Sequence, residues 1–97
     1  MASYVTLYRF TDQGLRNIRD TVTRARAGIA AIGKAGGKGT IYWTQGRYDM
    51  VGVFEAPADE DAANAILFST LQAGNVRTET MRALTAEEME RALKKIP

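Results

Sequence analysis

The sequence predicts an α+β domain in which a four-stranded antiparallel sheet carries helices on one face. Four segments rich in β-branched and aromatic residues alternate with two helix-like segments in the order βαββαβ. The helix-like segments repeat apolar residues every three or four positions, which is the period of an amphipathic helix. The order is that of the split βαβ, or ferredoxin-like, topology, and a further helix is expected at the C-terminal end.

The first strand and the first helix follow from local pattern. Residues 4–10 predict a strand, and Thr11 or Asp12 can cap the helix that follows. The apolar stripe of this helix is expected to contain Leu15, Ile18, Val22, Ala25, Ile29 and Ile32. Its outer face is expected to carry Arg16, Arg19, Asp20, Arg24 and Arg26. Asp20 and Arg24 are spaced to pair one turn apart, and the glycine-rich segment 35–39 ends the helix.

Two strand-like runs in the middle of the chain predict a hairpin. Residues 40–44 and 48–55 are separated only by residues 45–47. A two-residue type II′ turn with Gly46 at its first central position would place Trp43 opposite Met50 and Thr44 opposite Asp49. Gly52, inside the second strand, indicates either close packing against Ile41 or space for something else.

The second half of the chain repeats the helix and strand pattern. Asp59, Glu60 and Asp61 place three carboxylates where a helix begins, and Gly74 ends that helix. Residues 76–84 predict the fourth strand. Thr85 and Glu88 have the spacing of a capping box, so a short helix with an apolar inner side should follow. Residues 1–97 are therefore expected to form a single domain.

Composition excludes several kinds of chemistry. The chain has 97 residues, a net charge of +2, and neither cysteine nor histidine. Disulfides, thiolate nucleophiles and histidine bases are therefore excluded, and we expect no cofactor and no tightly bound transition metal. The sequence shows neither an apolar run long enough to span a membrane nor a signal-like leader, so we expect a cytoplasmic protein.

Three motifs carry a resemblance to a known family. They are residues 46–51 (GRYDMV), residues 54–57 (FEAP) and residues 75–80 (NVRTET). With them the chain resembles the GYD domain family of small bacterial proteins over nearly its whole length. The resemblance implies a dimeric α/β barrel. Strands that are apolar on both sides, with helices for only one, independently predict a homodimer or higher homo-oligomer.

Five residues are candidates for ligand binding: Tyr8, Trp43, Tyr48, Asp49 and Arg77. In one interpretation, Tyr48 and Trp43 form the wall of an apolar cavity, Asp49 is a base or hydrogen-bond acceptor, and Arg77 is an anion partner. In the other, Asp49 accepts bonds from Thr44 or nearby turn N–H groups and anchors the hairpin. Catalytic residues cannot be assigned, and whether the protein is an enzyme is left open.

Nucleic acid and phosphate are poorer candidate partners. Residues 33–40 are rich in glycine but lack the spacing of a phosphate loop and lead out of a helix rather than into one. The third strand matches the RNA-recognition motif only at Tyr48 and Val51. We therefore expect a dimer that binds a small apolar or aromatic molecule, with cofactor-independent oxygenase-like chemistry left open. The alternative is a non-catalytic homodimeric scaffold, and an enclosed apolar cavity would distinguish the two.

Overall fold

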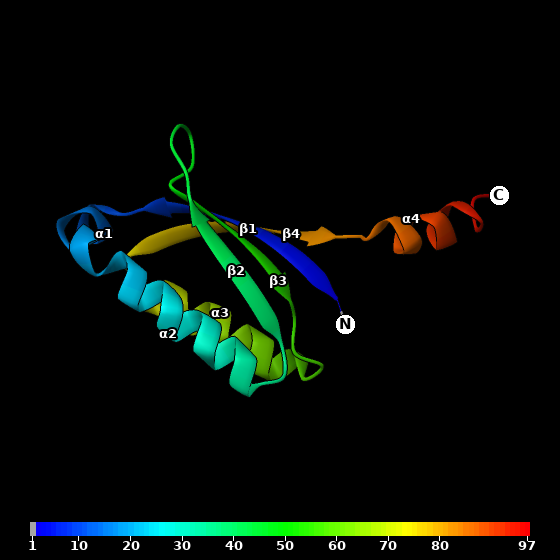
Figure 1. Ribbon diagram of the computed structural model, residues 1–97, viewed down its shortest axis with the longest axis horizontal. Coiled ribbons are helices and arrows are strands. Elements are labelled where there is room, and N and C mark those ends of the chain that lie inside the picture. The colour runs from blue at the N-terminus through cyan, green and yellow to red at the C-terminus, as the bar shows by residue number, and fades with distance from the viewer. Residues whose placement is uncertain (1) are drawn as a thin grey trace.

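The computed structural model describes residues 2–97 and contains one antiparallel sheet of order β2-β3-β1-β4. The strands are β1 (Ser3–Phe10), β2 (Lys38–Trp43), β3 (Met50–Glu55) and β4 (Val76–Ala83). The helices are α1 (Asp12–Arg16), α2 (Thr21–Lys34), α3 (Glu60–Gln72) and α4 (Ala86–Leu93), with a 3₁₀ turn at Ile18–Asp20. Helices α2 and α3 cover one face of the sheet (Figure 1). The ferredoxin-like α+β prediction, including the C-terminal helix, is confirmed.

Register assigns the strand side chains to the two faces, because directly paired residues point to the same side. Tyr8 pairs with Met50, and Met50 pairs with Trp43. This side of the sheet faces the helices. The opposite side, here called the open face, has a cluster of apolar residues that extends across the four strands: Val5, Leu7, Tyr42, Val51, Val53 and Met81. Both faces of the sheet are therefore apolar, as the sequence predicted.

The first helix is interrupted, so the prediction of one continuous helix is wrong. Asn17 ends α1 with φ −104° and ψ 24°, and the Asp20 amide then donates to the Asn17 carbonyl at 3.1 Å, which forms the 3₁₀ turn. The cause lies in how α1 docks. Gly14 lies so close to the backbone of Asn75 that no Cβ would fit there. Helix α1 is thus held against the start of β4, and the chain must turn before α2 can cross the sheet.

The interruption also rotates the inner side of α2 away from the predicted stripe. Ala25 is buried as predicted, but Val22 is 41% exposed. Arg24, expected on the outer face, is half-buried, and its Nη1 donates to the Asn17 carbonyl at 2.8 Å instead of pairing with Asp20. The salt bridge formed within residues 2–97 joins Arg82 to Glu88 at 3.3 Å.

The predicted hairpin forms with the expected pairing but with a different turn. Trp43 lies opposite Met50, and the Thr44 amide donates to the Asp49 carbonyl at 2.9 Å. The strands end there, so residues 44–49 form an open connection and not a two-residue turn. Gly46, with φ +109°, takes the left-handed conformation that glycine tolerates, and the Thr44 hydroxyl donates to the Tyr48 carbonyl at 2.7 Å. This loop projects beyond the sheet (Figure 1).

The remaining helix starts agree with the sequence. The Asp59 side chain accepts from the amides of Asp61 and Ala62, and Thr85 and Glu88 form the reciprocal capping box. Helix α4 extends past the end of the sheet, away from α2 and α3 (Figure 1). In the part of the chain that the structure describes, no helix combines the length and apolar character needed to cross a membrane.

Candidate functional site

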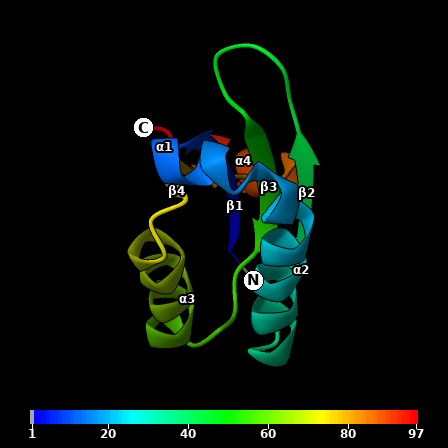
Figure 2. The same cartoon turned by 90° about the vertical axis from the view of Figure 1, so that its left-hand side faces the viewer.

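A cavity of about 1190 Å³ lies between the sheet and the two helices that cover it. We call it the interlayer cavity. Its sheet side includes residues from all four strands, and the opposite walls come from α2 and α3, which lie on the same side of the sheet (Figure 2). The apolar residues that line it include Tyr8, Ile41, Met50, Phe54, Ala25, Ile32, Ile66 and Leu67. Exposed wall residues such as Ser69 show that it opens to solvent.

The cavity arises because the helices present small residues to the sheet. Helix α2 lines it with Ala25, Gly28 and Ala31, and α3 contributes Ala63. A Cβ added at Gly28 would meet nothing within 4 Å. Protein interiors ordinarily contain few voids larger than a water molecule. The buried core cluster within residues 2–97 consists of Tyr8, Ala25 and Met50. It lies at the end of the sheet where β2 ends and β3 begins, which is therefore the packed end of the cavity.

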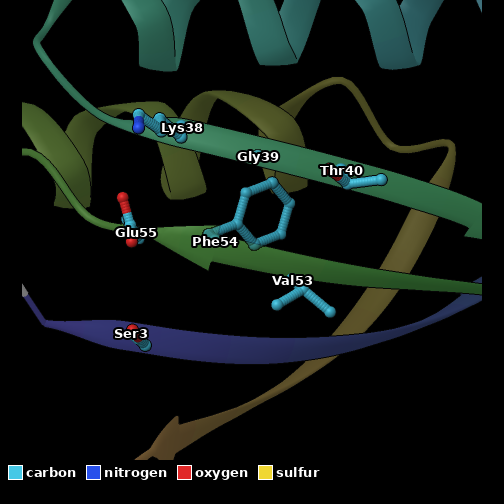
Figure 3. A pocket seen from close by; sticks show the side chains of 7 residues that line it. All are labelled: Ser3, Lys38, Gly39, Thr40, Val53, Phe54 and Glu55. Carbon is cyan, nitrogen blue, oxygen red and sulfur yellow. The ribbon is translucent and has the colours of Figure 1, made fainter. Parts of the chain in front are cut away.

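Phe54 forms much of the sheet side of the cavity, and two glycines make room for its ring. Added Cβ atoms at Gly39 and Gly52 would collide with this ring, and one at Gly52 would also approach Tyr8. Gly52 therefore provides space for aromatic rings rather than packing against Ile41. Figure 3 shows the Phe54 ring reaching from β3 toward Gly39. A smaller hollow of about 440 Å³ borders the same ring and is lined by Ser3, Lys38, Gly39, Thr40, Val53, Phe54 and Glu55.

Polar groups gather at the packed end of the interlayer cavity. Tyr8 is 8% exposed, and its burial raises the pKa of its phenol to about 12, so the hydroxyl stays protonated at neutral pH. The Thr21 hydroxyl accepts a hydrogen bond from Trp43 Nε1 at 3.0 Å. Arg24 also lies on this wall. Neutral donors and one cation therefore surround this end of an otherwise apolar space.

Asp49 anchors two strands and does not line the cavity. Its Oδ2 accepts from the backbone amide of Phe10 at 2.8 Å, and its own amide donates to the Tyr8 carbonyl at 2.9 Å. The carboxylate thus extends the pairing of β3 with β1 past the last ladder pair. The anchoring interpretation identified the right kind of contact, but the donor is in β1 and not in the hairpin turn.

Tyr48 and Arg77 lie on the other side of the sheet. The Tyr48 hydroxyl donates to Glu79 Oε2 at 3.0 Å, and the guanidinium carbons of Arg9 and Arg47 lie 5.1 and 5.8 Å from its ring centroid. Arg77 pairs directly with Arg9 in the ladder between β1 and β4. These residues form a charged edge of the open face rather than a wall of the interlayer cavity.

The five residues singled out from the sequence are therefore not brought together. Tyr8 lines the interlayer cavity, Trp43 bonds to a residue that lines it, and the other three lie elsewhere. Their ligand-binding roles stay predictions. Sequence reasoning missed Arg24 and the small residues of α2. The spacing of Ala25, Gly28 and Ala31 along one helix side was the signal that could have revealed them.

Comparison with known proteins identifies the family. No curated protein and no solved structure matches the chain significantly. Among the described residues, no group of three or more acidic side chains is placed to hold a metal ion. A family model, the GYD domain, matches residues 4–93. That span includes every strand pair of the sheet from Tyr4 onward, the walls of the interlayer cavity from α2 and α3, and the whole of α4. The chain belongs to the GYD domain family.

Proposed function

We propose that this protein binds a small, largely apolar molecule in the interlayer cavity. The observation that carries the proposal is the cavity itself, which is close in size to ligand pockets of about 300–1000 Å³. Its wall combines the rings of Tyr8 and Phe54 with aliphatic residues and a few hydroxyl groups. A scaffold protein has no need of such a space, because close packing of the two layers would stabilise it more.

Binding is supported more strongly than catalysis. Cofactor-independent oxygenation requires a protein base that removes a proton from the substrate. Tyr8 is the ionisable residue of the wall that is buried, and its raised pKa of about 12 makes it a hydrogen-bond donor at neutral pH. Asp49 already accepts the Phe10 amide. The proposal is therefore restricted to recognition of the ligand.

The open face supports a second part of the proposal, which is that the protein is a homodimer. On this face, Tyr42 of the edge strand β2 is 59% exposed and Val53 of β3 is 49% exposed. A second copy packed against it would cover the apolar cluster, since monomers rarely expose patches of more than a few hundred Å². We expect sedimentation equilibrium at micromolar concentration to give twice the chain mass. Val53→Glu should give the monomer, whereas Phe68→Glu, at an exposed site on α3, should not. A monomeric wild type would refute this part.

Ligand binding is tested with the neutral apolar fluorophore N-phenyl-1-naphthylamine and two matched variants. Gly28 and Gly33 both lie in α2, and an added Cβ at either site meets nothing within 4 Å, but only Gly28 is on the cavity wall. Gly28→Phe should fill the cavity and weaken probe binding at least about tenfold, which corresponds to about 1.4 kcal/mol. Gly33→Phe should bind as wild type. Equal affinities for all three proteins would refute the proposal.

A further inference from the structure

Arg24 is the cation on the wall of the interlayer cavity, and one nitrogen of its guanidinium lacks a hydrogen-bond partner among the described residues. Its Nη1 donates to the Asn17 carbonyl at 2.8 Å, which fixes the plane of the guanidinium. Its Nη2 is buried and has no hydrogen-bond partner within residues 2–97. A buried N–H group of a charged side chain is costly to leave without an acceptor. Something other than the described residues is therefore needed to accept this hydrogen bond.

The charges around the cavity indicate what that acceptor is. The wall residue with a carboxylate is Glu60, at the first position of α3. Arg24 lies one turn into α2, which begins beside the end of β2, as the bond from Trp43 to Thr21 shows. The start of α3 follows the end of β3, at the other end of the sheet. Arg24 and Glu60 therefore lie toward opposite ends of the cavity, and no carboxylate is among the described residues that line the cavity at the Arg24 end.

We propose that the ligand is an anionic amphiphile, with an apolar body in the interlayer cavity and an acidic group that accepts from Arg24 Nη2. This inference rests on the proposed function and specifies its ligand class. The acidic group, a carboxylate or an equivalent anion, supplies both the missing acceptor and the counter-charge. The polar residues at the same end, Thr21 and the protonated Tyr8, provide further hydroxyl groups beside that acidic group. A hydrogen bond between a guanidinium and an anion is about twice as strong as one between neutral groups.

The test compares two fluorophores that differ by one acidic group. N-phenyl-1-naphthylamine is neutral, and 1-anilinonaphthalene-8-sulfonate is the same ring system with a sulfonate. We expect wild type to bind the sulfonate about tenfold more tightly than the neutral probe. Arg24→Met should abolish this preference, so that the two probes bind this variant with similar affinity. Arg26→Met removes the same charge from an exposed site on α2 and should keep the preference.

The possible outcomes separate the two proposals. If Gly28→Phe fails to weaken the neutral probe, the proposed function fails. If that variant weakens the neutral probe but wild type does not prefer the sulfonate, or Arg24→Met keeps the preference, only the inference about the anion fails. Circular dichroism verifies that Arg24→Met is folded. If it is not, Arg24→Gln is used, because its amide can still donate to the Asn17 carbonyl. The same loss of preference is expected, and a retained preference overturns the inference.

Discussion

The Asp49 carboxylate provides a sharp test of whether this residue of the connection between β2 and β3 has a structural role. Its Oδ2 accepts the Phe10 amide at 2.8 Å in a half-buried position. Asp49→Ala leaves that amide without its charged acceptor, and hydrogen bonds to charged groups contribute about 1.5–3 kcal/mol. Taking about 2 kcal/mol, the melting temperature of a chain of this size should fall by about 8–16 °C. Asp49→Asn keeps one acceptor oxygen without the charge and should lose about half as much.

Paired thermal unfolding and probe titrations measure this prediction. Both variants should keep wild-type affinity for N-phenyl-1-naphthylamine, because Asp49 does not line the interlayer cavity. Asp20→Ala is the control, since Asp20 is exposed and makes no capping hydrogen bond. It should change the free energy of unfolding by less than about 0.5 kcal/mol. An Asp49→Asn protein that melts like wild type but has lost the probe would refute the structural interpretation.

Three further predictions concern other sites. Gly14→Ala places a Cβ against the Asn75 carbonyl and should lower the free energy of unfolding, measured by urea denaturation, by about 1–3 kcal/mol. Gly33→Ala should be neutral or stabilising, and equal urea midpoints for the two variants would contradict this. Burial raises the pKa of Tyr8 from 10.0 to about 12, so the unfolded chain loses this proton first and the free energy of unfolding should fall as pH rises from about 10 to about 12. Tyr8→Phe should abolish this contribution to the pH dependence. The hydrogen bond from the Thr85 backbone amide lowers the pKa of Glu88, so the helicity of α4, measured by NMR, should decline as pH falls below 4.5. If Glu88→Gln shows the same dependence of α4 helicity on pH as wild type, this prediction is wrong.

The sequence predicted most of the fold because the relevant signals are local. Strand composition, the capping residues Asp59 and Thr85, and the pairing of Trp43 with Met50 all follow from short-range pattern. The predicted turn was wrong because the ladder ends at the Trp43–Met50 pair, two pairs before the residues that would flank a two-residue turn. The break at Asn17 could not be predicted, since its cause is the contact of Gly14 with a strand far along the chain.

The candidate site was harder to predict for a related reason. Which side of the sheet a residue faces depends on register, and Tyr48 lies in a connection where strand alternation no longer applies. Its ring therefore reaches the open face, while Tyr8 points toward the helices. Arg24 was assigned to the solvent face by a helical repeat counted through the break at Asn17. The rotation introduced by the break placed it on the cavity wall instead.

The position of β1 in the sheet has a consequence for how the chain folds. This strand lies in the middle of the sheet, with β3 on one side and β4 on the other. Thr6 and Thr80, whose hydroxyls lie 3.2 Å apart across the β1–β4 pair, are 74 positions apart along the chain. Pairings between distant segments form slowly because a long loop must close first. During synthesis, β1 must wait until β4 has been made before its second edge is paired, and until then that edge is open to other chains.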